Sequence, residues 1–94
     1  MDIRKGSLVF IEKDIPAFVS DKSFIKGKMP VYKFTTDGGG FEDIPLEDIK
    51  ETHNIKEWLE ACRDFGFGKE HIIDKMKWLG IRSSTINIIK GQSI

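Results

Sequence analysis

The sequence lacks a second cysteine, a long hydrophobic run and an excess of either charge. Its single cysteine, Cys62, excludes an internal disulfide and a multi-cysteine zinc cluster, and it favours a reducing environment. No apolar stretch approaches the ~20 residues that a membrane-spanning helix needs. The first residues, "MDIRKGSLVFIEKD", carry too much charge for a secretory signal peptide. These absences predict a cytoplasmic protein with no membrane partner.

The sequence also shows no arrangement of residues that is typical of a catalytic or metal-binding site. The histidines, His53 and His71, lie far apart and have no carboxylate spacing typical of metal ligands. No nucleophile has a recognisable base, and Cys62 falls on an apolar stripe where nothing would activate its thiol. The segment "DGGG" lacks the Lys-Ser/Thr pair of a phosphate-binding loop. We therefore expect a protein that is not an enzyme, with no catalytic residues, no metal and no cofactor.

The basic and acidic residues are unevenly distributed along the chain. The formal net charge is zero, with 15 basic and 15 acidic residues. Residues 69–94 nevertheless hold five basic side chains and two acidic ones, a net of +3. This local excess is small for a nucleic-acid-binding surface, but it indicates where such a surface would lie.

The first half of the chain predicts strands. "SLVFIE" and "PAFVS" are rich in β-branched and aromatic residues, and "PVYKFTT" alternates with a period of two. "TDGGG" predicts a tight hairpin connection to "GFEDI", and "IPLEDIKE" predicts a short helical turn with Pro45 at its first position. The arrangement "KGSLVFIE…GKMPVYKFTTDGGGFEDIPLEDI" resembles a small SH3-like barrel. The resemblance implies a β-barrel or curved antiparallel sheet over residues 1–50.

The second half predicts helices. Ile55, Trp58, Leu59 and Cys62 share one helical stripe after an N-cap at Asn54 or Thr52. A second apolar stripe follows in "KEHIIDKMKWLG", and "RSSTINIIKG" predicts a third helix capped by Ser83 or Ser84. We expect residues 51–94 to form a helical part packed on the barrel, with Trp58 and Trp78 as clamps between the two. The fold class is therefore α+β.

The segment "IIDKMKWLGIRSSTINIIKG" resembles the helix-turn-helix of bacterial and phage repressors and of recombinase DNA-binding domains. Gly80 would take the positive φ of the turn, and Ile81 would fill the space between the two helices. In that family the outward residues of the second helix meet base edges and phosphates in the major groove. The resemblance implies a nucleic-acid-binding surface made of polar and basic side chains: Lys77, Arg82, Ser83, Ser84, Thr85, Asn87 and Lys90.

Three alternatives stay open at this point. The same helices could serve only packing or protein binding, and "DFGFG" resembles the Met-Gly-Phe-type loop of ubiquitin-associated three-helix domains at Gly66 and Phe67. The β-branched run "STINII" could instead form a terminal strand. Two departures from the helix-turn-helix pattern are Met76, where a small residue is usual, and the outward Ile88.

The pattern as a whole indicates a small regulatory protein, phage-like in its compactness, that binds DNA through its C-terminal part. The alternative function is a protein-interaction module, an inhibitor or adaptor that binds a larger protein. The zero net charge, the many aromatics and Ile88 favour this alternative.

Overall fold

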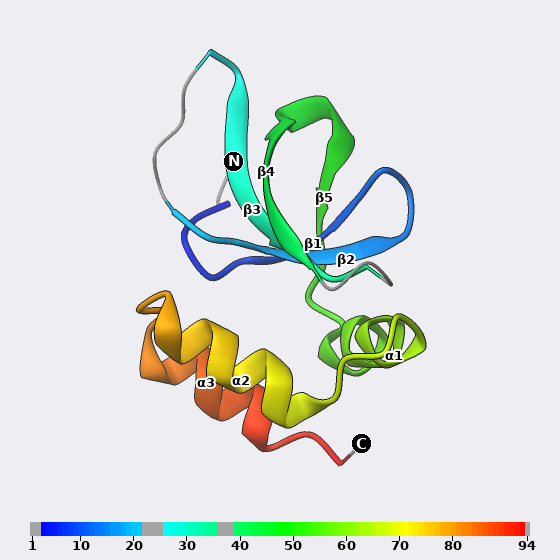
Figure 1. The fold of residues 1–94 in the computed structure, drawn as a ribbon, viewed down its shortest axis with the longest axis vertical. Coiled ribbons are helices and arrows are strands. Elements are labelled where there is room, and N and C mark those ends of the chain that lie inside the picture. The colour runs from blue at the N-terminus through cyan, green and yellow to red at the C-terminus, as the bar shows by residue number, and fades with distance from the viewer. Residues whose placement is uncertain (1–2, 22–25, 36–38, 94) are drawn as a thin grey trace.

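The computed structural model describes residues 3–21, 26–35 and 39–93 and has an α+β architecture (Figure 1). A curled antiparallel sheet of five strands forms a half-barrel, and three helices follow it in the chain. The strands are β1 (Leu8–Ile11), β2 (Ile15–Val19), β3 (Lys28–Lys33), β4 (Gly40–Pro45) and β5 (Ile49–Glu51), in the spatial order β4-β3-β2-β1-β5. The α+β prediction is therefore confirmed.

The predicted strands form close to their expected positions, and the connection after β4 is more extended than expected. The hairpin of β3 and β4 pairs Lys33 with Gly40, while residues 36–38 of the predicted glycine turn lie outside the described residues. The 3-10 helix η1 (Leu46–Asp48) follows Pro45 directly, so Pro45 precedes the helical turn instead of starting it. The chain then continues as β5, whose Ile49 pairs with Ile11 of β1. The expectation of a helical turn over the whole of "IPLEDIKE" was therefore wrong at its C-terminal end.

The sheet is apolar on both faces because successive strand residues point to opposite sides. Leu8 faces the helices, whereas Val9 and Ile11 face the inside of the curl. The inner cluster is made of residues from the five strands: Val9, Ile11, Ala17, Val19, Met29, Val31, Ile44 and Ile49. The outer cluster joins the sheet to the helices and includes Phe18, Tyr32, Phe34, Trp58, Leu59, Cys62, Phe67, Ile72 and Met76.

The first helix, α1 (Ile55–Asp64), lies under β1 and β2 (Figure 1). Asn54 is its N-cap, and the side-chain oxygen accepts a hydrogen bond from the backbone N–H of Glu57 at 3.1 Å. Trp58 is fully buried, and its indole Nε1 donates to the backbone oxygens of Val9 and Ala17 at 3.1 and 3.0 Å. The predicted clamp role of Trp58 agrees with this position.

Helices α2 (Lys69–Trp78) and α3 (Ser83–Lys90) pack against each other (Figure 1). Residues 83–90 are helical, so the terminal-strand alternative was wrong. The predicted serine caps are also wrong, because α3 begins at Ser83 and Arg82 occupies the N-cap position without a side-chain hydrogen bond. Trp78 is 68% exposed and meets Phe41 of β4 with ring centroids 6.4 Å apart, so it touches the sheet at the surface and is not a buried clamp like Trp58.

Candidate nucleic-acid interface

The turn between α2 and α3 has the geometry that the sequence predicts for its glycine. Gly80 has φ +73°, and its backbone N–H donates to the oxygen of Lys77 at 3.1 Å. The next N–H, from Ile81, donates to the oxygen of Met76 at 3.0 Å, which closes the end of α2. Ile81 is buried with Ile86 and Ile89 of α3, so it fills the space beneath the turn.

Gly6 lets the turn pack closely against the sheet half of the molecule. A Cβ atom at Gly6 would lie 3.1 Å from Cγ2 of Ile81 and 3.7 Å from Oγ1 of Thr85. Gly6 also has φ +92°, so both the space and the backbone conformation favour glycine there. Sequence reasoning missed this contact because Gly6 and Ile81 lie at opposite ends of the chain.

Most of the predicted binding residues lie together on the exposed side of the turn and of α3. Exposed residues comprise Lys77, Arg82, Ser83, Ser84, Asn87 and Lys90. Thr85 is half-buried and faces Gly6, so it was wrongly placed on the outward face. The outward surface is therefore a short polar face made of Ser83, Ser84 and Asn87, with Lys90 at its C-terminal end.

The structure adds one cation that the sequence did not indicate. Nζ of Lys5 lies 3.6 Å from the position that a Cβ atom at Gly80 would take. Lys5 therefore reaches the turn from the N-terminal segment, where Lys77 and Arg82 flank the same glycine in the chain. We name Lys5, Lys77 and Arg82 the basic turn cluster. It combines residues from both ends of the sequence around the turn that precedes α3.

The N-terminus of α3 receives no side-chain cap. The first backbone N–H groups of a helix have no partner within the helix and carry the positive end of its dipole. Uncapped N–H groups beside a basic cluster form an arrangement that suits a phosphate oxygen.

Ile88 borders a hollow at one edge of the polar face of α3. Its side chain is 49% exposed and lines a depression of about 170 Å³ together with Gly6, Thr52, Ile55 and Thr85. The depression lies between α3, the start of β1 and the segment that leads into α1. Ile88 therefore belongs to the boundary between α3 and the sheet half, at one edge of the polar face.

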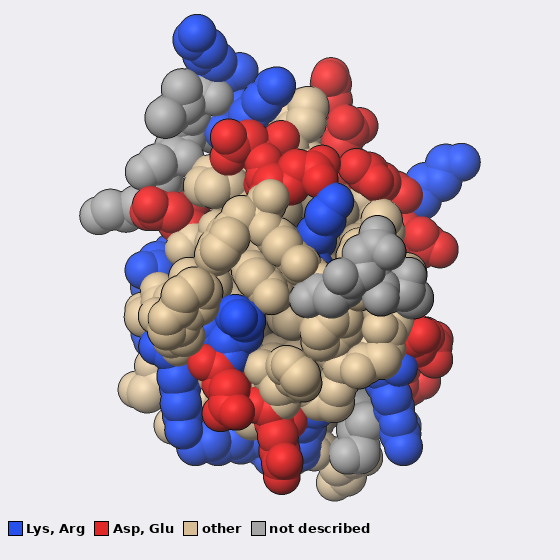
Figure 2. Space-filling model, viewed as in Figure 1, with Lys and Arg blue, Asp and Glu red and all other residues tan. Residues whose placement is uncertain are grey.

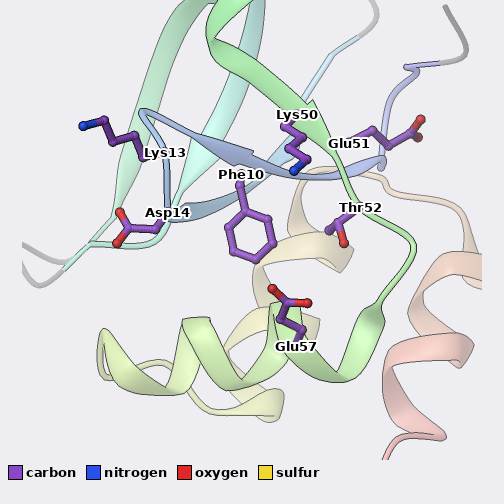
Figure 3. A pocket seen from close by; sticks show the side chains of 7 residues that line it. All are labelled: Phe10, Lys13, Asp14, Lys50, Glu51, Thr52 and Glu57. Atoms are coloured by element: carbon purple, nitrogen blue, oxygen red, sulfur yellow. The ribbon is translucent and has the colours of Figure 1, made fainter.

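A second hollow, of about 230 Å³, lies between the β1–β2 turn, β5 and α1 (Figure 3). The ring of Phe10 points down into it from β1, and the carboxylate of Glu57 points up from α1 (Figure 3). Its other lining residues are of mixed charge: Lys13, Asp14, Lys50, Glu51 and Thr52. Because the lining carries both charges, it does not indicate which class of ligand would bind in this hollow.

Groups suited to metal binding or thiol chemistry do not gather in the described parts of the chain. These parts contain no group of three or more histidine, cysteine, aspartate or glutamate side chains that could hold a metal ion. Cys62 is buried, and this burial raises the pKa of its thiol well above the ordinary value. Among the described helices, none is both long and apolar enough to cross a membrane.

Comparison of the chain with protein-family models, with curated proteins and with solved structures found no match. The class that the structure itself defines is an α+β protein with a half-barrel sheet and a C-terminal helical part.

Proposed function

We propose that the protein is a small, non-enzymatic, cytoplasmic regulatory protein that binds DNA through α3 and the basic turn cluster. The observation that carries this proposal is the exposed polar face of α3, whose uncapped N-terminus follows Arg82 and the turn that Lys5 reaches. A polar face flanked by cations suits a groove whose walls are phosphates and whose floor presents hydrogen-bonding base edges.

Each residue of this surface has a distinct role in the proposal. Lys5, Lys77 and Arg82 contact phosphates, and the N–H groups of the first turn of α3 receive a phosphate oxygen. Asn87 presents an amide that can pair with both N6 and N7 of adenine. Ser83 and Ser84 supply short hydroxyl groups that accept several base edges, and Lys90 extends the phosphate contact at the end of the helix.

The small size of this surface favours a modest and salt-sensitive affinity. The basic turn cluster and Lys90 offer about four phosphate contacts, and each neutralised phosphate adds about one unit to the salt dependence of binding. We expect accessory or weakly specific contact with duplex DNA, because repressor-type recognition needs two copies spaced by one turn of DNA.

A double substitution tests the proposal. Arg82→Ala with Asn87→Ala should abolish binding of a mixed-sequence duplex, measured by fluorescence anisotropy at low salt, and leave the thermal melt unchanged because both residues are exposed. Arg63→Ala, at an exposed arginine of α1, is the matched control and should retain binding. Retained binding by the double variant would contradict the assignment of α3.

A protein-interaction module is the second candidate function. It is supported by two large aromatic side chains, Phe41 and Trp78, which are exposed. Salt separates the two functions, because a DNA complex weakens steeply between low and moderate salt whereas an apolar protein interface hardly responds.

A further inference from the structure

Two exposed aromatic rings meet where the sheet and the helices come together. Trp78 at the end of α2 is 68% exposed, and Phe41 on β4 is 56% exposed. Their ring centroids are 6.4 Å apart, and Phe41 also contacts Tyr32 of β3 edge-to-face at 5.1 Å. We name Tyr32, Phe41 and Trp78 the aromatic patch. Single exposed hydrophobic residues are common, but adjacent aromatics from separate elements are typical of interaction surfaces.

A lysine lies within the aromatic patch and contacts two of its rings. Nζ of Lys75 is 4.7 Å from the ring centroid of Trp78 and 5.2 Å from that of Tyr32. The negative faces of aromatic rings attract a cation at these distances. Lys75 therefore links the rings of Tyr32 and Trp78, and its positive charge is part of the patch.

The border of the aromatic patch is acidic. Glu70, Asp74 and Trp78 follow one another at intervals of four residues, so they form one stripe along the exposed side of α2. Glu70 and Asp74 line a shallow hollow of about 330 Å³ beside the patch, together with His71 and Lys75.

On the other side of the patch, β4 contributes the exposed Asp43, which lies two residues after Phe41 and therefore on the same face of the strand. Three carboxylates therefore border the patch, from Asp43, Glu70 and Asp74, against the ammonium group of Lys75. The balance is −2. Figure 2 shows acidic side chains above and below a central area of this face in which Lys or Arg side chains also lie.

We propose that the aromatic patch binds an extended segment of a partner protein that carries a bulky hydrophobic side chain close to lysine or arginine residues. The hydrophobic side chain covers Trp78 and Phe41, and the basic residues pair with Asp74 and Glu70. The acidic border selects such a segment and disfavours nucleic acid, whose phosphates it repels.

The position of β4 suits an extended partner. β4 is the last strand of the sheet, and no strand of the described residues pairs with its outer edge. A segment that runs along this edge can form main-chain hydrogen bonds while one side chain reaches the rings. This proposal deepens the second candidate function and does not depend on DNA binding by α3.

Selection from a random linear peptide library displayed on phage tests the proposal. The whole protein is the target, and the Trp78→Ala variant, which alters an exposed site, is used for counter-selection. We expect the enriched peptides to combine an aromatic or large aliphatic residue with two or more Lys or Arg residues. A synthetic peptide from this set should change the fluorescence of the exposed Trp78, while the buried Trp58 gives a constant background.

Charge variants then test the acidic border by isothermal titration calorimetry with the same peptide. Glu70→Gln with Asp74→Asn should weaken binding about tenfold, which corresponds to the loss of about two exposed ion pairs. Glu60→Gln with Asp64→Asn is the matched control, because these exposed residues of α1 have the same spacing and charge. The control should bind like the unchanged protein.

The outcomes separate this proposal from the broader one. The basic-partner proposal would be overturned if the enriched peptides depend on Trp78 but are acidic or uncharged. It would also be overturned if the Glu70→Gln, Asp74→Asn variant binds the peptide as tightly as the unchanged protein. Either result would leave the protein-interaction function standing. No enrichment over the Trp78→Ala variant would overturn both. Quenching of Trp78 by single-stranded DNA would assign the patch to nucleic acid instead.

Discussion

Trp58 connects the two halves of the molecule at the scale of a single residue. Its ring packs edge-on against Phe34 of the sheet half, with centroids 5.9 Å apart, and its N–H is shared between two strand carbonyls. A buried indole is tolerated only when its N–H finds a partner. Trp58 therefore fixes both the distance and the orientation of α1 relative to β1 and β2.

Replacement of Trp58 by phenylalanine should destabilise the protein markedly. The smaller ring leaves a cavity and removes a donor from the oxygens of Val9 and Ala17, which together should cost about 2 kcal/mol or more. Urea unfolding followed by far-UV circular dichroism measures this loss. Trp78→Phe is the matched control at an exposed site and should change stability by no more than about 0.5 kcal/mol. Equal losses at both positions would contradict the contrast between the two tryptophans.

The residue type alone could not predict that Trp58 is buried and Trp78 is exposed. Trp58 shares a helical stripe with Leu59 and Cys62, so its burial follows from the sequence. Trp78 lies two residues after the buried Met76, which turns it to the opposite side of α2. The aromatic type suggested a clamp at both positions, but the helical period predicts exposure for Trp78.

At the scale of elements, the two ends of the helical part differ in how their helices begin. Asn54 accepts a hydrogen bond from the backbone N–H of Glu57, and its side-chain amide donates to the Glu57 carboxylate at 3.1 Å. These two reciprocal hydrogen bonds stabilise the first turn of α1. α3 begins without such a bond, although two serines stand in its first turn. The difference leaves the N-terminus of α3 open to an external acceptor.

Asn54→Ala should therefore cost about 1 kcal/mol, the usual loss on removal of a side-chain cap. Ser84→Ala serves as the comparison and should change stability by less than about 0.5 kcal/mol, since Ser84 lies within α3 and caps nothing. Thermal melts of the two variants, recorded at the same pH, compare them directly. A large loss for Ser84→Ala would show that this serine caps α3 in solution.

The sequence predicted the longer elements more accurately than their junctions. The strands of the β3–β4 hairpin and the three helices follow from local alternation and helical spacing. β5 has only three residues and is defined by pairing with β1, about 40 residues away in the chain, so local pattern could not reveal it. The same limit applies to Lys5 and Gly6, which reach the α2–α3 turn only through the tertiary fold.

At the scale of the whole molecule, the outer apolar cluster makes the two halves dependent on each other. Leu8, Phe18 and Phe34 of the sheet half are buried in the same cluster as residues of all three helices. Without the helices, these side chains would face water on one whole side of the half-barrel. The inner cluster alone offers a small apolar core for so short a chain.

A fragment of residues 1–53 should accordingly fail to show a cooperative thermal transition. The complete chain should unfold in one step, with far-UV circular dichroism and the fluorescence of Trp58 following the same curve. Both measurements use the same buffer and protein concentration. A fragment with its own sharp transition would show that the half-barrel is stable alone and that the helices are an independent appendage.

At the scale of the whole molecule, two surfaces differ in their chemistry. The exposed polar face of α3 lies beside the basic turn cluster, whereas the aromatic patch has an acidic border. A net charge of zero over the chain is therefore compatible with one face that attracts phosphates and another that attracts basic peptides.

The most direct test of DNA binding by α3 is a titration of the isotope-labelled protein with a mixed-sequence DNA duplex at low salt, followed by amide chemical shifts. We predict the largest shifts at residues 82–90, including the side-chain amide of Asn87, and a return toward the free spectrum as salt is raised. Shifts confined to the region of Phe41 and Trp78, or an unchanged spectrum at low salt, would contradict DNA binding by α3.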